Sequence, residues 1–294
     1  MQQARTREQL WAQVRPWRAA GQRIALVPTM GNLHDGHLAL VEAARRHADR
    51  VITSLYVNPT QFGAGEDFAR YPRTPEDDLQ HLRAARCDLA FVPDDSAIYP
   101  LGLDGATLLR AAPALAGILE GVVRPGHFDG VVTVVARLLN LCAPDFAVFG
   151  EKDYQQLLVV RRMVEDLGYP LRIVPVPTVR EPDGLALSSR NRFLGASERT
   201  AANRLSAVLR DAADQAGQDG ADHREVERVA LERLQQEGWR VDYVAVRRAL
   251  DLGEPGRGDR DLRVLAAAWC GQTRLIDNCP ASGPDPAAHP TAQA

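Results

Sequence analysis

The chain has 294 residues, of which 45% are hydrophobic and 25% are charged, and its formal net charge at pH 7 is −3. This size and composition are typical of a globular protein with one large or two ordinary domains. The near balance of charge argues against a general nucleic-acid or membrane surface, and no apolar run approaches the ~20 residues of a membrane-spanning helix.

The four cysteines are widely spaced and form no CxxC pair. Such cysteines are typical of reduced, mostly buried thiols in a cytosolic protein. The first residues, Met1 to Arg5, are not followed by the apolar segment of a secretion signal. We therefore expect a cytoplasmic protein.

The first 178 residues alternate short apolar runs, typical of buried strands, with stretches of helical periodicity. The expected helices cover 3–20, 38–48, 75–86, 131–141 and 154–167, and the expected strands cover 24–27, 51–57, 89–92, 146–149 and 172–176. This alternation predicts βαβ units and a parallel sheet, as in a Rossmann-like α/β domain. Such sheets bind ligands at the carboxyl ends of their strands, so the loops that follow the strands are candidate sites.

Beyond residue 180 the pattern changes to two long helices followed by three short strands. The helices are expected at 197–216 and 222–237, and the strands at 241–246, 262–267 and 273–276. We therefore expect two domains, residues 1–178 and a smaller α+β domain at 179–279. Residues 280–294 contain four prolines and no periodicity, which predicts a disordered tail.

The loop after the first predicted strand, residues 28–37, reads PTMGNLHDGH. Gly31 and Gly36 allow close backbone approach, and the N-terminus of the following helix offers unpaired N–H donors to an anion. His34 and His37 are three residues apart and face the same way on the first helical turn, where they could stabilise phosphate charge. Two other interpretations stay open: a metal pair with Asp35, and a capped helix with incidental histidines.

Lys152 is the only lysine among 35 basic residues, and it follows the predicted strand 146–149. Lysine is a compact point charge, whereas arginine is a wide planar fork, so a single retained lysine suggests contact with a crowded anion such as a phosphate. Drift that left one surface lysine is the alternative.

Three further loops carry polar groups that suit ligand binding. Gln61 follows the second strand in YVNPTQFG and offers both a donor and an acceptor. Asp77 and Asp78 lie in the first turn of a helix with Thr74 as its expected N-cap and Pro75 as its first residue. They could hold Mg²⁺, although acids in a first turn also complement the helix dipole. The segment LSSRN at 187–191 is rich in donors for phosphates.

A glycine-hinged segment, RPGHFDG at 124–130, precedes the expected buried helix. It contains Arg124 and His127, which suit either a loop that grips a ligand or an ordinary turn. The sequence does not decide between the two.

Together these segments resemble the pantoate–β-alanine ligase (pantothenate synthetase) family. The motifs PTMGNLHDGH, YVNPTQFG, RYPRTPEDD, RPGHFDGV, FGEKDYQQL and LSSRN stand in that family's order, and the resemblance extends to about Cys279. HxGH alone would indicate only the broader HIGH-type nucleotidyltransferase superfamily. The resemblance implies a Rossmann-like N-terminal domain, a smaller C-terminal lid, a homodimer, ATP and Mg²⁺.

The implied reaction joins (R)-pantoate to β-alanine through a pantoyl-adenylate and releases AMP and pyrophosphate. The catalytic residues implied are His37, His34 and Lys152. The implied ATP contacts are Met30, Gly31, His34, His37, Gly150, Glu151, Lys152, Asp153, Val179, Leu187, Ser188, Ser189 and Arg190. The implied contacts to pantoate and β-alanine are Gln61, Gln156, Asn58 and Met30, and Asp77 and Asp78 form the implied magnesium region. Arg124 and His127 are further candidates.

Some residues depart from the family pattern, and three other functions remain open. His81 stands where some relatives have an amide beside the metal, and Leu187 stands where methionine is common. The alternatives are an adenylate-forming enzyme with another acid or amine, a catalytically silent relative, and a metal hydrolase built on the two histidines.

Overall fold

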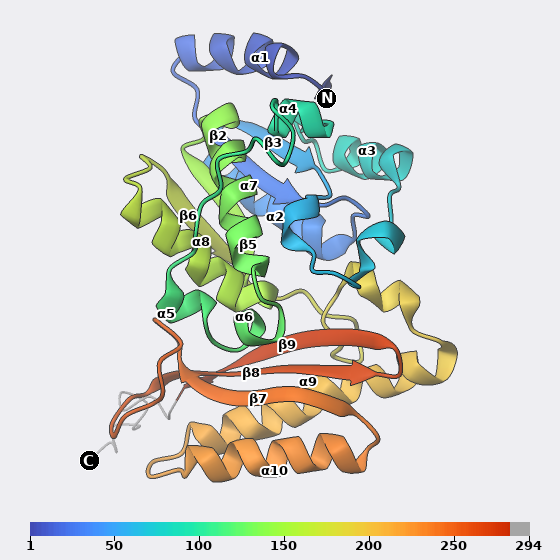
Figure 1. Ribbon diagram of the computed structural model, residues 1–294, viewed down its shortest axis with the longest axis vertical. Coiled ribbons are helices and arrows are strands. Elements are labelled where there is room, and N and C mark those ends of the chain that lie inside the picture. The colour runs from blue at the N-terminus through green and yellow to red at the C-terminus, as the bar shows by residue number, and fades with distance from the viewer. Residues whose placement is uncertain (283–294) are drawn as a thin grey trace, which may run out of the picture. The chain divides into compact units, whose positions relative to one another are not determined.

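A computed structural model describes residues 1–282, which form two compact units (Figure 1). Unit 1 consists of Met1–Val179 and Leu187–Ser189, and unit 2 consists of Arg180–Ala186 and the described chain from Arg190 onward. The chain therefore passes from one unit to the other three times: after Val179, after Ala186 and after Ser189.

Unit 1 is built on a six-stranded parallel sheet with the strand order β1-β4-β3-β2-β5-β6. In that order the strands are β1 (Gln2–Ala4), β4 (Leu89–Phe91), β3 (Arg50–Leu55), β2 (Ile24–Thr29), β5 (Phe146–Gly150) and β6 (Arg172–Val176). Strand β2 pairs with β3 on one side and with β5 on the other. Because these three strands run in the same direction, the loops that follow them meet at one edge of the sheet.

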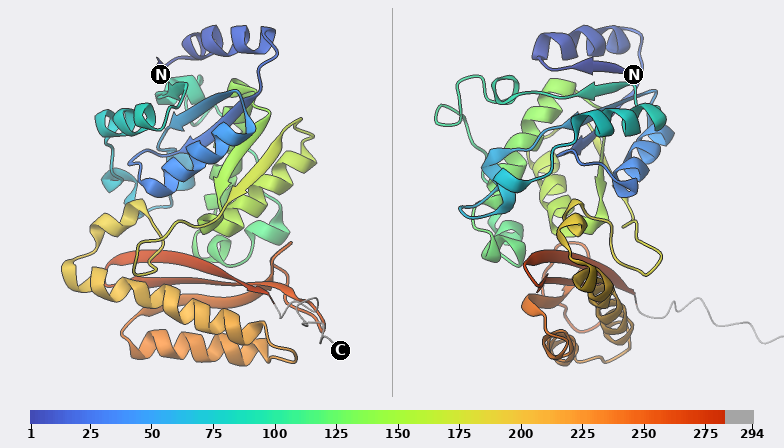
Figure 2. Two further views of the ribbon diagram at one scale, coloured as in Figure 1. Left: turned by 180° about the vertical axis from the view of Figure 1, so that it is seen from behind. Right: turned by 90° about the vertical axis from the view of Figure 1, so that its right-hand side faces the viewer.

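Helices cover both faces of this sheet. The longer ones are α1 (Arg7–Ala19), α2 (Asp35–His47), α3 (Pro75–Ala84), α7 (His127–Cys142) and α8 (Tyr154–Asp166). Helices α7 and α8 lie in front of the sheet in Figure 1, whereas α2 lies in front in the reverse view of Figure 2. Val41 and Ala44 of α2 pack in one apolar cluster with Ala25 and Val27 of β2, which fixes the position of the loop between these two elements.

The connections of unit 1 contain short helical segments. These are α4 (Asp95–Ile98), α5 (Pro113–Ala116), α6 (Glu120–Val123) and the 3₁₀ turns η1 (Pro59–Gln61), η2 (Asp67–Arg70) and η3 (Glu151–Asp153). Turn η1 follows β3 and η3 follows β5, so both lie at the same sheet edge as the loop after β2.

Unit 2 packs two helices on a three-stranded antiparallel sheet. Its elements are η4 (Ser189–Phe193, shared with unit 1), α9 (Ala196–Ala216), α10 (His223–Gln236), β7 (Arg240–Arg248), β8 (Asp261–Cys270) and β9 (Thr273–Ser282). One apolar cluster joins Leu205 and Leu209 of α9, Leu234 of α10 and Val264 and Ala266 of β8. The predicted α/β class, with a smaller α+β part at the C-terminus, is confirmed.

Most expected boundaries lie within three residues of the observed ones, and three were wrong by more. Residues 2–4 form an edge strand rather than the start of a helix; α1 begins only after Thr6, whose hydroxyl caps it by accepting from the Gln9 N–H. Helix α7 begins at His127, so the predicted loop at 124–130 is partly its first turn. Strand β9 runs to Ser282, so residues 280–282 are not a tail; the rest of the predicted tail, 283–294, lies outside the described residues.

Candidate active site

The loop between β2 and α2 adopts a left-handed turn that one buried carboxylate holds. Gly31 has φ +81° and Asn32 has φ +51°, and such values are uncommon for a residue with a side chain. The Asp78 carboxylate, 3% exposed, accepts the N–H groups of Asn32 at 2.9 Å and Leu33 at 2.7 Å, and the Thr74 hydroxyl at 3.2 Å. A Cβ on Gly31 would lie 2.9 Å from Asp78 Oδ2, so the turn leaves no room for a side chain there.

The two histidines of this loop stack on each other at the start of α2. Their ring centroids are 4.0 Å apart, and His37 Nδ1 accepts the backbone N–H of His34 at 3.3 Å. In a neutral His37 ring the proton is therefore on Nε2. A Cβ on Gly36 would lie 2.9 Å from His34 Nδ1, so only glycine leaves room for this ring. His34 Nδ1 is buried without a hydrogen-bond partner among the described residues, which suits a site that a ligand completes.

Lys152 lies in η3, directly after β5, the sheet neighbour of β2. Its side chain is 20% exposed, and its ammonium is 3.8 Å from the Asp153 carboxylate. Burial and then the charge of Lys152 lower the pKa of His34 to about 4. Burial, His34 and Lys152 lower the pKa of His37 to about 3. The structure thus brings the predicted lysine and both histidines together, and both imidazoles are neutral at pH 7.

The predicted substrate amide, Gln61, lies at the end of η1, next to the same loop. It is 8% exposed, and its carboxamide nitrogen is 3.2 Å from the sulfur of Met30. Its carboxamide oxygen accepts from Asn58 at 3.2 Å. Asn58 is 1% exposed and also accepts from the Tyr99 hydroxyl at 2.7 Å. The buried Asn58 side chain is thus fixed by Tyr99 and in turn orients the Gln61 carboxamide.

The two glutamines that open α8 differ in their surroundings. Gln156, the predicted substrate contact, is only partly buried. Gln155 is buried, and its carboxamide nitrogen donates to the carbonyls of Leu115 at 2.7 Å and Ile118 at 2.8 Å. Its oxygen accepts the N–H of Glu120 at 3.1 Å. Gln155 thus holds the segment around α5 and α6, and Gln156 is the one of the pair that is open to a ligand.

The remaining predicted nucleotide contacts fall on two groups of residues. Gly150, Glu151 and Asp153 surround Lys152 at the end of β5. Within unit 1 the Leu187 N–H donates to the Val179 carbonyl at 3.0 Å, and the Ser189 hydroxyl donates to the Asn32 carbonyl at 3.2 Å. The first bond ties the predicted phosphate segment, which includes Ser188, to the chain after β6, and the second ties it to the loop that carries the histidines. Arg190 belongs to unit 2.

Asp77 and Asp78 do not fit a shared magnesium site. Asp77 is exposed, while Asp78 is buried with both oxygens occupied by the loop after β2. Adjacent residues on a helix also point in different directions. No group of three or more His, Cys, Asp or Glu side chains within residues 1–282 could hold a metal ion, so the histidine-based metal site receives no structural support either.

Thr29 shapes the site and was not predicted from the sequence. The Thr29 hydroxyl donates to the Ser54 carbonyl at 2.7 Å and accepts the Gly31 N–H at 3.2 Å, which ties the end of β2 to β3. Arg124 and His127, for which the sequence left open a loop that grips a ligand or an ordinary turn, bind the backbone carbonyl of Gln61. A polar residue that ends an otherwise apolar strand, such as Thr29, was the available signal.

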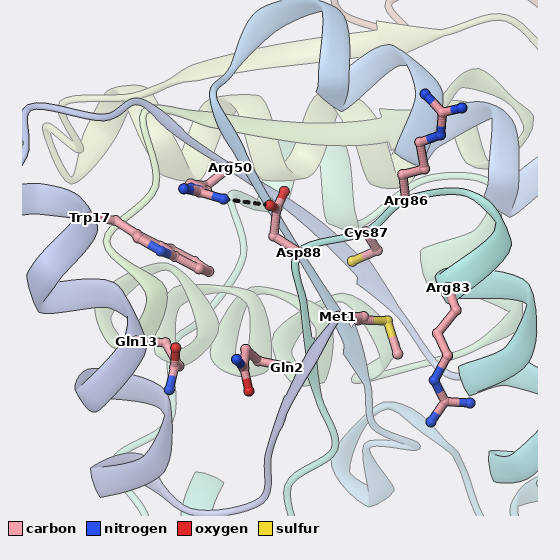
Figure 3. Close-up of a pocket in the computed structure, with 9 residues that line it drawn as sticks. All are labelled: Met1, Gln2, Gln13, Trp17, Arg50, Arg83, Arg86, Cys87 and Asp88. Atoms are coloured by element: carbon pink, nitrogen blue, oxygen red, sulfur yellow. Dashed lines mark hydrogen bonds and ion pairs between the residues drawn. The ribbon is translucent and has the colours of Figure 1, made fainter.

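A separate hollow of about 480 Å³ lies at the opposite edge of unit 1, beside the amino ends of β1, β3 and β4 (Figure 3). The Arg50 guanidinium binds Asp88 at 2.9 Å, and Figure 3 shows Arg83 and Arg86 extending away from that pair. None of the predicted site residues lines this hollow. Among the helices of residues 1–282, none has the length and apolar character to cross a membrane.

Comparison with known proteins gives consistent results. The profile of the pantoate–β-alanine ligase family matches residues 2–280. The pantothenate synthetase of Thioalkalivibrio sulfidiphilus is 52% identical over 97% of this chain and 99% of its own, and that of Xanthomonas axonopodis pv. citri is 54% identical over 92% and 95%.

Solved structures agree with these sequence matches. The crystal structure of pantothenate synthetase from Thermus thermophilus has a TM-score of 0.89 and 46% identity, covering 96% of this chain and 100% of that one. The pantoate–β-alanine ligase of Francisella tularensis, described as complexed with β-γ ATP and β-alanine, has a TM-score of 0.79 and 34% identity, covering 97% and 100%. The chain therefore belongs to the pantoate–β-alanine ligase family.

Proposed function

We propose that this chain condenses (R)-pantoate with β-alanine, using ATP and releasing AMP and pyrophosphate. The observation that carries the proposal is the grouping of His34, His37 and Lys152 where β2 and β5 end side by side. Family membership and the relative described as complexed with β-γ ATP and β-alanine support the same reaction.

In the first step the pantoate carboxylate attacks the α-phosphorus of ATP and pyrophosphate leaves. This displacement needs positioning and charge stabilisation rather than an enzyme nucleophile. The ammonium of Lys152 supplies the positive charge, and the N-terminus of α2 adds backbone N–H donors. A neutral His37 carries its proton on Nε2 and so can donate a hydrogen bond to a phosphate oxygen without adding a full charge.

The second step is attack of the β-alanine amine on the acyl carbon of the adenylate, with AMP as the leaving group. The acid is held by the carboxamides of Gln61 and Gln156 beside Met30, with Asn58 behind Gln61. The nucleotide contacts proposed from the family are Met30, Gly31, Gly150, Glu151, Asp153, Val179, Leu187, Ser188, Ser189 and Arg190.

Three further properties are proposed from the family alone. ATP would be used as its Mg²⁺ complex, in which the ion would neutralise phosphate charge. Neither Asp77 nor Asp78 is assigned to it. The chain forms a homodimer and works in the cytoplasm; sedimentation of the purified protein tests the dimer.

The deciding experiment is mass analysis of products from ATP, pantoate and β-alanine, with each substrate omitted in turn. Pantothenate and AMP should form only when all three are present. Pantoate alone should support exchange of labelled pyrophosphate into ATP, because the adenylate forms before the amine reacts. Exchange that ignores pantoate but responds to another acid would assign the site to a different adenylate-forming reaction.

A further inference from the structure

The backbone carbonyl of Gln61 is bound by two side chains from the region where α7 begins. His127 Nδ1 donates to it at 2.8 Å and Arg124 Nη2 at 3.3 Å. Arg124 is itself fixed by Glu66, which accepts from Nε at 2.8 Å and from Nη2 at 2.7 Å. Burial alone would raise the pKa of Glu66, but the hydrogen bonds and charge of Arg124 keep it below its ordinary value.

Hydrogen-bond complementarity fixes the tautomer of His127. A carbonyl oxygen can only accept, so Nδ1 carries the proton, and a guanidinium can only donate, so Nε2, 3.0 Å from Arg124 Nη1, offers its lone pair. Burial and then the charge of Arg124 lower the pKa of His127 to about 4, which agrees with a neutral ring. Both ring nitrogens are therefore engaged within the protein.

The surrounding backbone leaves Gln61 little freedom. A Cβ on Gly130 would lie 2.2 Å from the Thr60 carbonyl oxygen, so the first turn of α7 lies directly against η1. Asn58 donates both to the Gly130 carbonyl and to the Gln61 carboxamide at 3.2 Å each. The position of Gln61 is thus set at its peptide by Arg124 and His127 and at its side chain by Asn58.

We propose that Arg124 and His127 are positioning residues for the acid substrate: they hold the Gln61 peptide and thereby place the Gln61 carboxamide, without touching substrate themselves. The three Arg124 nitrogens and the two His127 nitrogens all bind groups of the protein. This inference rests on the proposed role of Gln61 in binding pantoate.

The test compares His127→Phe, which keeps the ring but removes both nitrogens, with His127→Asn, whose amide nitrogen can replace the Nδ1 donor. The measurements are pantoate-dependent ATP–pyrophosphate exchange and the Kd for ATP without pantoate. His127→Phe should raise the half-saturating pantoate concentration roughly tenfold, the equivalent of about one hydrogen bond. It should leave the Kd for ATP within about twofold, and His127→Asn should recover most of the loss.

A matched control separates positioning from simple destabilisation. Val131 lies in the same first turns of α7 and is 2% exposed, so Val131→Ala should lower the Tm of the protein without changing the pantoate requirement. If His127→Phe does not fold, Glu66→Gln weakens the hold on Arg124 and is measured in the same way. An equal rise in the pantoate requirement for Val131→Ala would overturn the proposal.

A double-mutant cycle with Gln61→Ala tests whether His127 acts through Gln61. The double variant should be no worse than Gln61→Ala within about twofold, because the carboxamide that His127 positions is already absent. If the increases in half-saturating pantoate concentration of the two single variants multiply in the double variant, His127 acts through a group other than Gln61, and the inference is overturned. An unchanged pantoate requirement in Gln61→Ala would remove the role of Gln61, and the inference with it, while pantoate-dependent exchange would still support the proposed reaction.

Discussion

The substitution Asp78→Asn tests whether the Asp78 carboxylate holds the loop after β2 or binds a metal ion. In the structure Asp78 accepts the N–H groups of Asn32 and Leu33 at 2.9 and 2.7 Å. An asparagine keeps one acceptor oxygen but turns an NH₂ group toward the other backbone donor. One buried N–H then lacks an acceptor, and the remaining bond loses its charge assistance.

The expected magnitude follows from these two bonds. An orphaned buried donor costs about 1–3 kcal/mol, and a charge-assisted bond is worth about twice a neutral one, so the free energy of unfolding should fall by roughly 2–4 kcal/mol. For a domain of this size that corresponds to a Tm lower by about 5–15 °C. The left-handed turn at Gly31 and Asn32 should loosen, and the Kd for ATP should rise about tenfold or more, the equivalent of about 1.4 kcal/mol.

The assay combines thermal unfolding with ATP binding measured across a range of Mg²⁺ concentrations. Added Mg²⁺ should not restore binding in Asp78→Asn, because the defect lies in the loop. Asp77→Asn is the matched control: Asp77 is exposed, so its stability change should stay within about 0.5 kcal/mol. If Asp78→Asn had the wild-type Tm and regained ATP binding at high Mg²⁺, the structural role would be refuted and Asp78 would instead be a magnesium ligand.

Both Lys152→Ala and Lys152→Arg should lose about 2–4 kcal/mol of transition-state stabilisation, measured as a lower kcat/KM. Wild-type turnover in the arginine variant would contradict the need for a compact ammonium. The pKa values of His34 and His37, about 4 and about 3, lie below the ordinary value of 6.5. Between pH 6.5 and pH 4, therefore, these histidines take up protons mainly in the unfolded chain. The free energy of unfolding, measured in urea, should therefore fall from pH 6.5 toward pH 4, by at most about 1.4 kcal/mol per pH unit for each histidine. A free energy that does not change with pH would contradict the prediction, and so would an unchanged pH dependence in a His34→Asn/His37→Asn variant. Arg180 binds Asp277 through both oxygens at 2.7 and 2.9 Å, and Asp277 is 3% exposed. Arg180→Met should cost about 3–5 kcal/mol in urea unfolding, and adding Asp277→Asn should recover part of it; no recovery would mean that the buried charge is not the cause.

The residues that could be predicted from the sequence are those whose signal is local. His34 and His37 follow a strand and open a helix within ten residues, and Lys152 stands out by residue type. The partners that hold the site are distant in sequence: Asp78 is 46 residues from Asn32, and His127 is 66 residues from Gln61. Hydrophobic periodicity carries no information about such pairings.

Element boundaries failed where tertiary contacts override the local pattern. Residues 2–4 are too few to show alternation, and they form a strand because β4 offers an open edge. Helix α7 extends back to His127, and the glycine at 130, which weakens a helix on propensity alone, is needed there for the contact with Thr60.

The three passages of the chain between the units mean that neither unit is an uninterrupted stretch of sequence. A fragment ending at residue 179 would lose Leu187–Ser189, and with them the hydroxyl that reaches the Asn32 carbonyl from 157 residues away. Dissection at any one site therefore leaves at least one unit incomplete: a cut after Val179 takes Leu187–Ser189 from unit 1, and a cut after Ser189 takes Arg180–Ala186 from unit 2. The two units are interleaved in their primary structure, and a fragment that contains the whole of unit 1 must extend to Ser189 and so include Arg180–Ala186 of unit 2.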